Sequence, residues 1–362
     1  MECYIGLDVS QRQTAICVVD AKGKIVVEGK SLTRPGDIHG WLVARNVQIS
    51  SIVRIGIEAG AMSAWLHIEL TKLGLPLICL EAFQAHRFLK TYRNKTDKND
   101  ARGLAQLVRI GGEFIRPVTV RARSSQEDRT LLTLRQQLVQ QRIGLENNIT
   151  GSLKPFGLLV PRGNVNSKTF RERVMAALVK ADELGLTLSD GIMPSLDLYE
   201  DLCKHLAILT RRVEAVSRDN PVCRRLMTAP GVGPIIALSF VTAVDNPLRF
   251  SNNEDIGAYF GLTPKQYQSG ETDYQGSISR LGNSMTRVHL VQAATVLLSS
   301  SRKWSTLRAW GMKVAKRRGF NKARIAVARK LAIVLHRMWI NEQDFRWSNK
   351  TEGGELASSA AA

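Results

Sequence analysis

The sequence contains 362 residues, of which 44% are hydrophobic and 23% are charged, so length and composition predict an ordinary globular protein of two or three domains. Lys and Arg number 51 against 32 Asp and Glu, which gives a formal net charge of +19 at pH 7. Because a polyanion would neutralise this charge, nucleic acid is the leading expected partner, ahead of an acidic protein or a membrane surface.

The cysteine pattern and the hydropathy exclude several classes of protein. The five cysteines are scattered without a C-x-x-C pair, which argues against a disulfide scaffold and a zinc ribbon and fits a reducing cytoplasm. No basic segment followed by an apolar run marks a signal peptide, and the longest strongly apolar stretch, 235–244, is too short to span a bilayer. We therefore expect a cytoplasmic, nucleoid-associated protein with no membrane partner.

Residues 1–125 alternate short apolar runs with helical patterns. Helices are expected over 37–45 and 61–73, and a further helix is expected to begin near residue 97. The apolar runs that predict strands lie at 4–9, 14–19, 25–27, 51–58 and 75–80. This order predicts an α/β domain whose mixed sheet carries helices on its faces.

Four carboxylates stand out in this first domain. Asp8 interrupts an apolar strand, where a buried, unpaired carboxylate would be costly. Glu58 ends the fourth strand, which in such a sheet can lie beside the first. Asp97 and Asp100 are three residues apart at the start of a helix and so share one face. Together these oxygen ligands would suit Mg²⁺, and two such ions can activate an attacking oxygen and stabilise a leaving one on a phosphodiester.

Each acid also has a purely structural interpretation. Asp8 can form a hydrogen bond with a turn, and Asp97 or Asp100 can cap the N-terminus of a helix. The first strand allows another enzyme class as well, because residues 6–10, Gly-Leu-Asp-Val-Ser, resemble the first phosphate loop of actin-like and sugar-kinase ATPases. Those proteins need a second glycine-rich phosphate loop and an adenosine site, and neither follows residue 60, so an ATPase is the less supported alternative.

Residues 126–219 predict a helical arm or linker. Apolar residues recur close to a heptad at 131, 134, 138, 145 and 149, and again at 199, 202, 206, 209, 213 and 216. The segment 151–166 between these helices holds five Gly or Pro residues and is predicted as a loop. The two helices therefore suggest an antiparallel coiled-coil arm, with a helical linker packed on a domain as the alternative.

Residues 220–345 predict a mostly helical C-terminal domain, followed by a disordered tail over 346–362. The stretch 226–237 has the form of a helix-hairpin-helix. Its Pro-Gly-Val-Gly turn, with Gly231 and Gly233, would aim backbone N–H groups at a phosphate or would simply pack two helices together.

A serine precedes glycine at Ser269, in a predicted loop beside Lys265 and Tyr267. A serine nucleophile needs a base or a metal, and the nearest histidine in sequence, His289, is 20 residues away. From spacing alone, Ser269 is therefore better explained as a turn residue than as a nucleophile.

From 302 to 339 the sequence is rich in Lys and Arg, has interleaved aromatics and contains no Asp or Glu, which indicates phosphate contact rather than an ordinary solvated helix. The aromatics there are interpreted as core rather than as stacking platforms. The candidate nucleic-acid-binding residues are Gly231, Gly233, Lys265, Arg302, Lys303, Lys316, Arg317, Arg318, Lys322 and Arg324.

In combination, these motifs resemble one family, the DEDD transposases of bacterial insertion sequences of the IS-one-ten type. The resemblance runs in order over residues 3–340. The segments that carry it are Tyr-Ile-Gly-Leu-Asp (4–8), Ile-Glu-Ala-Gly (57–60), Asn-Lys-Thr-Asp-Lys-Asn-Asp-Ala-Arg (94–102), Pro-Gly-Val-Gly (230–233), Phe-Gly-Leu-Thr-Pro (260–264), Tyr-Gln-Ser-Gly (267–270) and Gly-Ser-Ile-Ser-Arg-Leu-Gly-Asn (276–283).

The resemblance implies a RuvC-like, ribonuclease-H-type first domain with Asp8, Glu58, Asp97 and Asp100 around Mg²⁺. It also implies that Ser269 attacks a DNA phosphodiester and forms a transient phosphoserine link. The family works with a structured non-coding RNA that pairs with donor and target DNA, so base pairing would supply specificity. The arm would join protomers into a dimer and, at synapsis, a tetramer whose active site combines acids and serine from different protomers.

Two alternatives to this RNA-guided recombinase remain open. One is a RuvC-like metal-dependent nuclease or Holliday-junction resolvase that uses the acids and a water molecule, so that Ser269 is dispensable. The other is a non-enzymatic nucleic-acid-binding scaffold, in which replacing the acids would change little.

Overall fold

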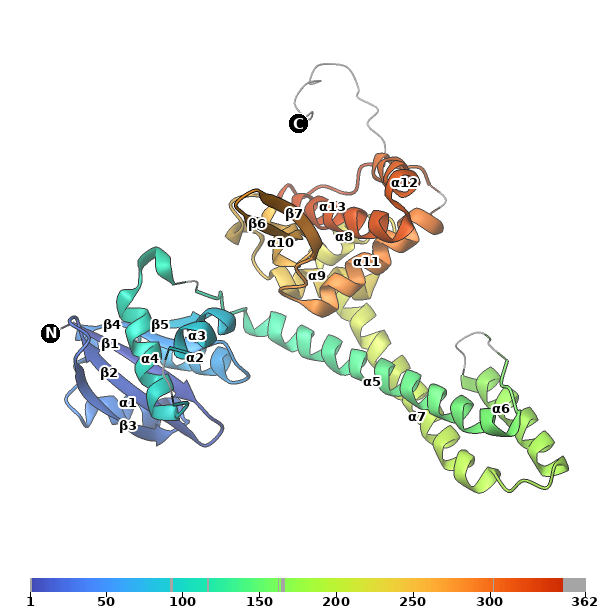
Figure 1. The fold of residues 1–362 in the computed structure, drawn as a ribbon, viewed down its shortest axis with the longest axis horizontal. Coiled ribbons are helices and arrows are strands. Elements are labelled where there is room, and N and C mark those ends of the chain that lie inside the picture. Colours follow the sequence, from blue (N-terminus) through green and yellow to red (C-terminus); the bar gives the residue numbers. More distant parts are fainter. Residues whose placement is uncertain are drawn as a thin grey trace, which may run out of the picture. The chain divides into compact units, whose positions relative to one another are not determined.

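The computed structural model describes residues 2–91, 94–115, 117–161, 163, 167–301 and 303–347. The chain divides into two compact units, Met1–Arg121 and Ala122–Ala362. Most of the tail expected over 346–362 lies outside the described residues, as does the candidate phosphate-binding residue Arg302. Figure 1 colours the units along the chain.

The first unit is built on a five-stranded mixed sheet, which confirms the predicted α/β class. Its strands are β1 (Cys3–Val9), β2 (Gln13–Asp20), β3 (Ile25–Leu32), β4 (Ile52–Glu58) and β5 (Leu77–Leu80). Their order is β3-β2-β1-β4-β5, with β1, β2 and β3 antiparallel and β1, β4 and β5 parallel. This arrangement fits the ribonuclease-H-type sheet that the resemblance implied. Strand β3 runs five residues beyond its predicted end at 27.

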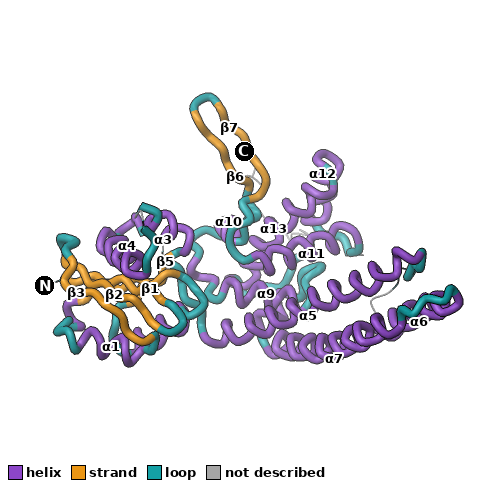
Figure 2. Tube along the Cα trace, turned by 60° about the horizontal axis from the view of Figure 1, so that its bottom comes forward, coloured by secondary structure: helices purple, strands orange, loops and turns teal. Residues whose placement is uncertain are grey.

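Helices cover both faces of this sheet, as Figure 2 shows with α3 and α4 on one side and α1 on the other. Their bounds are α1 (Pro35–Val43), α2 (Ser63–Lys72), α3 (Ala82–Leu89) and α4 (Asp97–Ile110). Helices α1 and α2 bury their apolar sides against Ile5 and Leu7 of β1. Tyr4, whose side chain points to the opposite face, packs with α4.

Two glycines let α4 lie unusually close to the sheet. Gly6 of β1 and Gly56 of β4 are register partners on adjacent strands. A Cβ atom at Gly6 would overlap backbone atoms of Ala101 and Ala105, and one at Gly56 would crowd Val108. The helix backbone therefore rests directly on the two central strands, and this contact sets where the first turn of α4 lies.

The second unit begins with two long helices, α5 (Arg123–Leu153) and α7 (Ser189–Asp219), which pack side by side and run antiparallel (Figures 1 and 2). Helix α6 (Ser167–Glu183) lies against α7 near the far end of the pair, where Phe170 and Tyr199 anchor a small separate core. Every apolar heptad position that the sequence predicts in α7 is buried or half-buried. In α5, however, the heptad residue Leu134 is 55% exposed and Leu132 is buried in its place.

The loop predicted over 151–166 is wrong at its start, because α5 continues to Leu153 and a 3₁₀ turn follows over Lys154–Phe156. Gly151 is tolerated inside the helix, and the chain first leaves helical geometry at Gly157, which has a φ of +74°. Residues 162 and 164–166 of this segment lie outside the described residues.

The rest of the second unit is mostly helical, as predicted. Its elements are α8 (Pro221–Leu226), α9 (Pro234–Val244), α10 (Asp255–Tyr259), β6 (Pro264–Ser269), β7 (Thr272–Ile278), α11 (Ser284–Ser299), α12 (Thr306–Arg318) and α13 (Phe320–Ile340). Helix α9 is buried along nearly its whole length within the core that α11 and α13 complete. Leu132 of α5 and Val213 of α7 belong to the same core, so the base of the helical pair is packed into this domain.

The segment around Ser269 is not the predicted loop but a β-hairpin. Strands β6 and β7 pair antiparallel, and Gly270 and Glu271 form a two-residue turn between the paired residues Ser269 and Thr272. Gly270 takes a φ of +55°, which the turn requires and which glycine adopts without strain. The signal that was missed is the β-propensity of Tyr267 and Tyr274, which stack across the hairpin with ring centroids 5.0 Å apart.

We predict that Gly6→Ala destabilises the first unit by about 2 kcal/mol or more, because the new methyl group must displace the backbone of α4. The matched control is Gly40→Ala, at an exposed position in α1 with no neighbouring atom within 4 Å of the added carbon. The control should gain about 0.5–1 kcal/mol of stability. Guanidinium unfolding followed by circular dichroism measures both, and equal midpoints for Gly6→Ala and the unmodified protein would contradict the proposed close contact.

Candidate active site

Asp8 and Glu58 lie at the carboxyl ends of two neighbouring parallel strands. The register pairs Leu7 with Ile57, so Asp8 and Glu58 occupy equivalent positions on β1 and β4. Because side chains alternate along a strand, both point to the face that Gly6 and Gly56 present to α4. Both acids line one pocket of about 460 Å³, together with residues 9–11 and 59–63.

The other two acids come from the first turn of α4. Thr96 caps this helix, with its side-chain oxygen accepting a hydrogen bond from the backbone N–H of Asn99. The alternative in which Asp97 or Asp100 caps the helix is therefore wrong, and both carboxylates are free of that role. Since α4 lies across β1 and β4, its first turn comes near the strand ends where Asp8 and Glu58 lie.

The carboxylates interact strongly at Asp8. Burial is the largest cause that raises the pKa of Asp8, and the charges of Asp100, Asp97 and Glu58 contribute next in that order. Together, and against the opposing charge of Lys95, they raise this pKa to about 6. Burial also raises the pKa of Glu58, against the opposing charge of His86 and with a contribution from Asp100. The structure therefore brings the four predicted acids into one electrostatic group.

Asp97 differs from the other three acids. Its carboxylate accepts a hydrogen bond from Lys30 Nζ at 2.7 Å, and this bond lowers the pKa of Asp97. Among the described residues, no three His, Cys, Asp or Glu side chains lie close enough together to hold a metal ion. The acids are thus neighbours at longer range, with Asp97 turned toward the lysine of β3.

Two charged residues that the sequence analysis did not single out support this arrangement. Glu28 of β3 accepts hydrogen bonds from Arg102 at 2.8 and 3.0 Å and pairs with Lys98 at 2.6 Å, which lowers the pKa of Glu28 to about 2. Lys30 follows on the same face of β3. No sequence motif marks either residue, because their partners are more than 60 positions away along the chain.

Ser269 lies in the second unit, at the end of β6 and next to the turn of the exposed hairpin. Tyr267 and Tyr274 share its face of the hairpin. Within the described part of the chain, the Ser269 hydroxyl has no hydrogen-bonding side-chain partner. His289 does not serve as its base, because that imidazole is buried in α11 and burial lowers its pKa to about 4.

The Pro-Gly-Val-Gly turn joins α8 to α9, and its glycines have different surroundings. Gly231 has a φ of +79°, and a Cβ atom there would overlap the carbonyl oxygen of Ala293 in α11. This contact favours the packing interpretation for Gly231. Gly233 has no atom within 4 Å of its Cβ direction and immediately precedes Pro234, the first residue of α9.

The remaining basic candidates are on the surface of the second unit. Lys316, Arg317 and Arg318 form the exposed last turn of α12, and Lys322 and Arg324 follow at the start of α13. Lys303 lies 5.3 Å from the Trp347 ring, and Lys265 is exposed on β6. Over the described ranges, none of these cations has an ion-pair partner, which leaves them available to phosphate.

No helix in the described residues has the length and hydropathy needed to cross a membrane.

Two family models match the chain. A DEDD transposase model of the IS110 type matches residues 5–156, and the transposase IS116/IS110/IS902 family matches residues 223–309. The matches cover the acids in the first unit and the serine hairpin in the second.

Curated relatives extend the similarity over most of the chain. The transposase for insertion sequence element IS1111A of Coxiella burnetii is 27% identical over 352 residues, covering 94% of this chain and 91% of that protein. A probable family 20 transposase of Pseudomonas aeruginosa is 26% identical, covering 81% and 85%. The transposase for IS1328 of Yersinia enterocolitica is 27% identical, covering 77% and 81%. Taken together, the two family models and these similarities over most of the chain identify the protein as an IS110-type DEDD transposase, a DNA transposase of an insertion sequence.

Proposed function

We propose that this transposase is an RNA-guided recombinase that cleaves and rejoins DNA through Ser269, assisted by Mg²⁺ held at Asp8, Glu58, Asp97 and Asp100. The observation that carries the proposal is the convergence of three acidic charges, those of Asp100, Asp97 and Glu58, on the partly buried Asp8. Such a group of like charges is unfavourable unless cations neutralise it or the reaction uses it.

The donor set fits Mg²⁺ in its chemistry. All four side chains offer carboxylate oxygens, which hard divalent cations prefer, and a divalent charge would offset the repulsion that raises the pKa of Asp8. Asp97 would join the group by exchanging its exposed ion pair with Lys30 for the cation. The bound ion would supply charge stabilisation at the reacting phosphate.

The chemical step is a transesterification at phosphorus. Ser269 Oγ forms a bond to phosphorus while the bond from phosphorus to a deoxyribose oxygen breaks; the serine proton passes to a carboxylate and the leaving oxygen takes a proton from water. A hydroxyl of the recipient strand then attacks the phosphoserine and forms the new phosphodiester bond as the bond from phosphorus to Ser269 Oγ breaks. Its proton passes to the hydroxide left by the first step, and the carboxylate returns its proton to Ser269 Oγ. The number of phosphodiester bonds is conserved, so the element moves without an energy-rich cofactor.

The serine and the acids are proposed to come from different protomers. Ser269 is exposed and has no base among the described residues of its own unit, which supports activation by a group outside that unit. The antiparallel helices α5 and α7 carry exposed apolar side chains at Leu134, Leu198 and Ile208, which supports a coiled-coil role in joining protomers into a dimer and a tetramer. The net charge of +19 supports simultaneous binding of guide RNA and DNA.

We predict that Ser269→Ala abolishes a covalent protein–DNA adduct. The protein is incubated with Mg²⁺, the non-coding RNA from beside its gene and end-labelled element-end DNA, then denatured and examined for label that migrates with protein. Ser279→Ala, a change at a half-buried serine just beyond the hairpin, is the control and should keep the adduct. Cleaved ends without an adduct in the unmodified protein would instead indicate a nuclease that uses water.

Asp8→Asn should stabilise the metal-free protein at pH 7.5. A pKa raised from 3.8 to about 6 means that the folded state binds the proton more tightly, so stability falls as pH rises through that range. Removing the charge should therefore gain about 1–2 kcal/mol at pH 7.5, allowing for solvent screening, and nothing below about pH 4.

Melting temperatures with and without Mg²⁺ test this prediction. Mg²⁺ should raise the melting temperature of the unmodified protein and of the control Asp182→Asn, an exposed acid in α6, and leave that of Asp8→Asn unchanged. Asp8→Asn being less stable than the unmodified protein at pH 7.5, or Mg²⁺ stabilising it equally, would refute the acidic site.

A further inference from the structure

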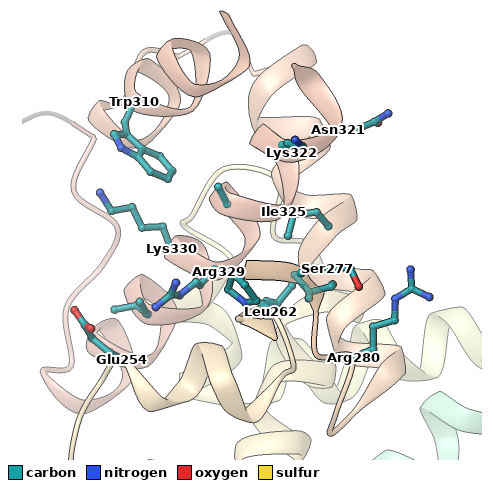
Figure 3. A pocket seen from close by; sticks show the side chains of 15 residues that line it. Glu254, Leu262, Ser277, Arg280, Trp310, Asn321, Lys322, Ile325, Arg329 and Lys330 are labelled. Atoms are coloured by element: carbon teal, nitrogen blue, oxygen red, sulfur yellow. The ribbon is translucent and has the colours of Figure 1, made fainter. Parts of the chain in front are cut away.

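A second concave site lies in the second unit, between the base of the β6–β7 hairpin and helices α12 and α13. It is a groove of about 740 Å³, within the size range of pockets that hold small organic ligands. Figure 3 shows Trp310 and Lys330 toward one end, Arg280 toward the other, and Leu262 and Ile325 between them. The four acids of the candidate active site and Ser269 do not line this groove.

The groove combines an apolar floor with a basic rim. The apolar side chains of Leu262, Ile325 and Ile333 line the groove, and the aromatic ring of Trp310 lines it as well. Its lining contains four cations and one acid: Arg280, Lys322, Arg329, Lys330 and Glu254. Lys330 Nζ lies 4.3 Å from the centre of the Trp310 ring, and in the described chain none of the four cations has an ion-pair partner.

The apolar floor and the basic rim together indicate which kind of ligand fits the groove. An apolar peptide segment would cover the floor but leave four cations without counter-charge, and a phosphate alone would pair with the rim but leave the floor in contact with water. A nucleotide carries both a flat, weakly polar base and an anionic phosphate. Extrahelical bases are held in this way, by stacking on apolar and aromatic side chains with cations at the backbone.

We propose that the groove between the hairpin and α13 receives one unpaired nucleotide of the DNA substrate. The base lies on Ile325 and Ile333 beside Trp310, and the flanking phosphates contact Arg280, Lys322 and Arg329. Ala326 also lines the groove, and its small side chain leaves room for the base. The site holds the DNA strand next to the hairpin without reading a long sequence.

The position of the groove also gives a spacing, which rests on the proposed role of Ser269. Pro264 lines the groove, and Ser269 lies five residues further along the same strand. At ~3.3 Å per residue this is about 17 Å, equivalent to about five base pairs of B-form DNA. The unpaired nucleotide is therefore expected within about five base pairs of the phosphate that Ser269 attacks.

Binding of defined DNA tests the groove independently of any cleavage. Fluorescein-labelled duplexes of identical sequence are compared, one fully paired and one with a single unpaired thymidine, at about 0.15 M salt without Mg²⁺. The unmodified protein should bind the bulged duplex about tenfold more tightly than the paired one. Ala326→Trp, which fills the groove and leaves every cation in place, should reduce this ratio to about one and weaken binding to the paired duplex less than twofold.

Two further variants keep the test decisive. Val296→Trp adds the same bulk at an exposed position of α11 outside the groove and should retain the tenfold ratio. Lys322→Glu, on the exposed rim, should lower the ratio even if Ala326→Trp fails to fold. Because no strand is cut in these measurements, failure of the Ser269 chemistry would leave them unchanged.

Three results would overturn the proposal. The first is equal affinity of the unmodified protein for paired and bulged DNA. The second is a larger discrimination for the matching bulged RNA duplex, which would assign the groove to RNA. The third is a change in oligomeric state of folded Ala326→Trp in sedimentation without nucleic acid, which would assign the groove to a second copy of this chain.

Discussion

The close approach of α4 to strands β1 and β4 is the contact on which the candidate active site depends. At Gly6 and Gly56 there is no Cβ atom, so the helix backbone rests on the sheet itself. Any larger side chain at either position would lift the helix and with it the first turn that bears Asp97 and Asp100. The geometry of the acidic group thus follows from two residues that carry no chemistry.

That contact also brings about the repulsion between the carboxylates of the site. It brings carboxylates from a helix terminus toward carboxylates at two strand ends, and the pKa of Asp8 rises because its charge is both desolvated and repelled. The N-terminus of α4 favours the acids on its own first turn. Lys30 and Lys95 supply positive charge from outside the group. Added cations would offset the repulsion in a site of this kind. Ionisation of its carboxylates without such cations lowers the stability of the folded protein.

In the second unit, the candidate functional residue lies outside the packed core. Its core is large and almost entirely apolar, with α9 at its centre, whereas the hairpin that carries Ser269 has almost every residue exposed. An isolated two-stranded hairpin gains little from its own packing. This hairpin is supported by the Tyr267–Tyr274 stack, and its base lies beside the groove on α13. The Ser269 hydroxyl is therefore exposed to other molecules rather than packed against this domain.

Much of this protein could be read from local sequence. The succession of strands and helices along the chain, the long helices α5 and α7 and the acids at strand and helix ends follow from short-range hydrophobic periodicity and from motif spacing, which depend on neighbouring residues alone. The hairpin at Ser269 was missed because exposed strands have no apolar alternation. Leu134 was wrongly assigned to the buried face of α5, because the buried face of a straight helix drifts relative to a heptad repeat and the packing partner was unknown. The tertiary structure alone decided that Asp97 meets Lys30, that Gly231 packs on α11 and that a basic groove forms beside the hairpin, because each joins residues far apart in the chain.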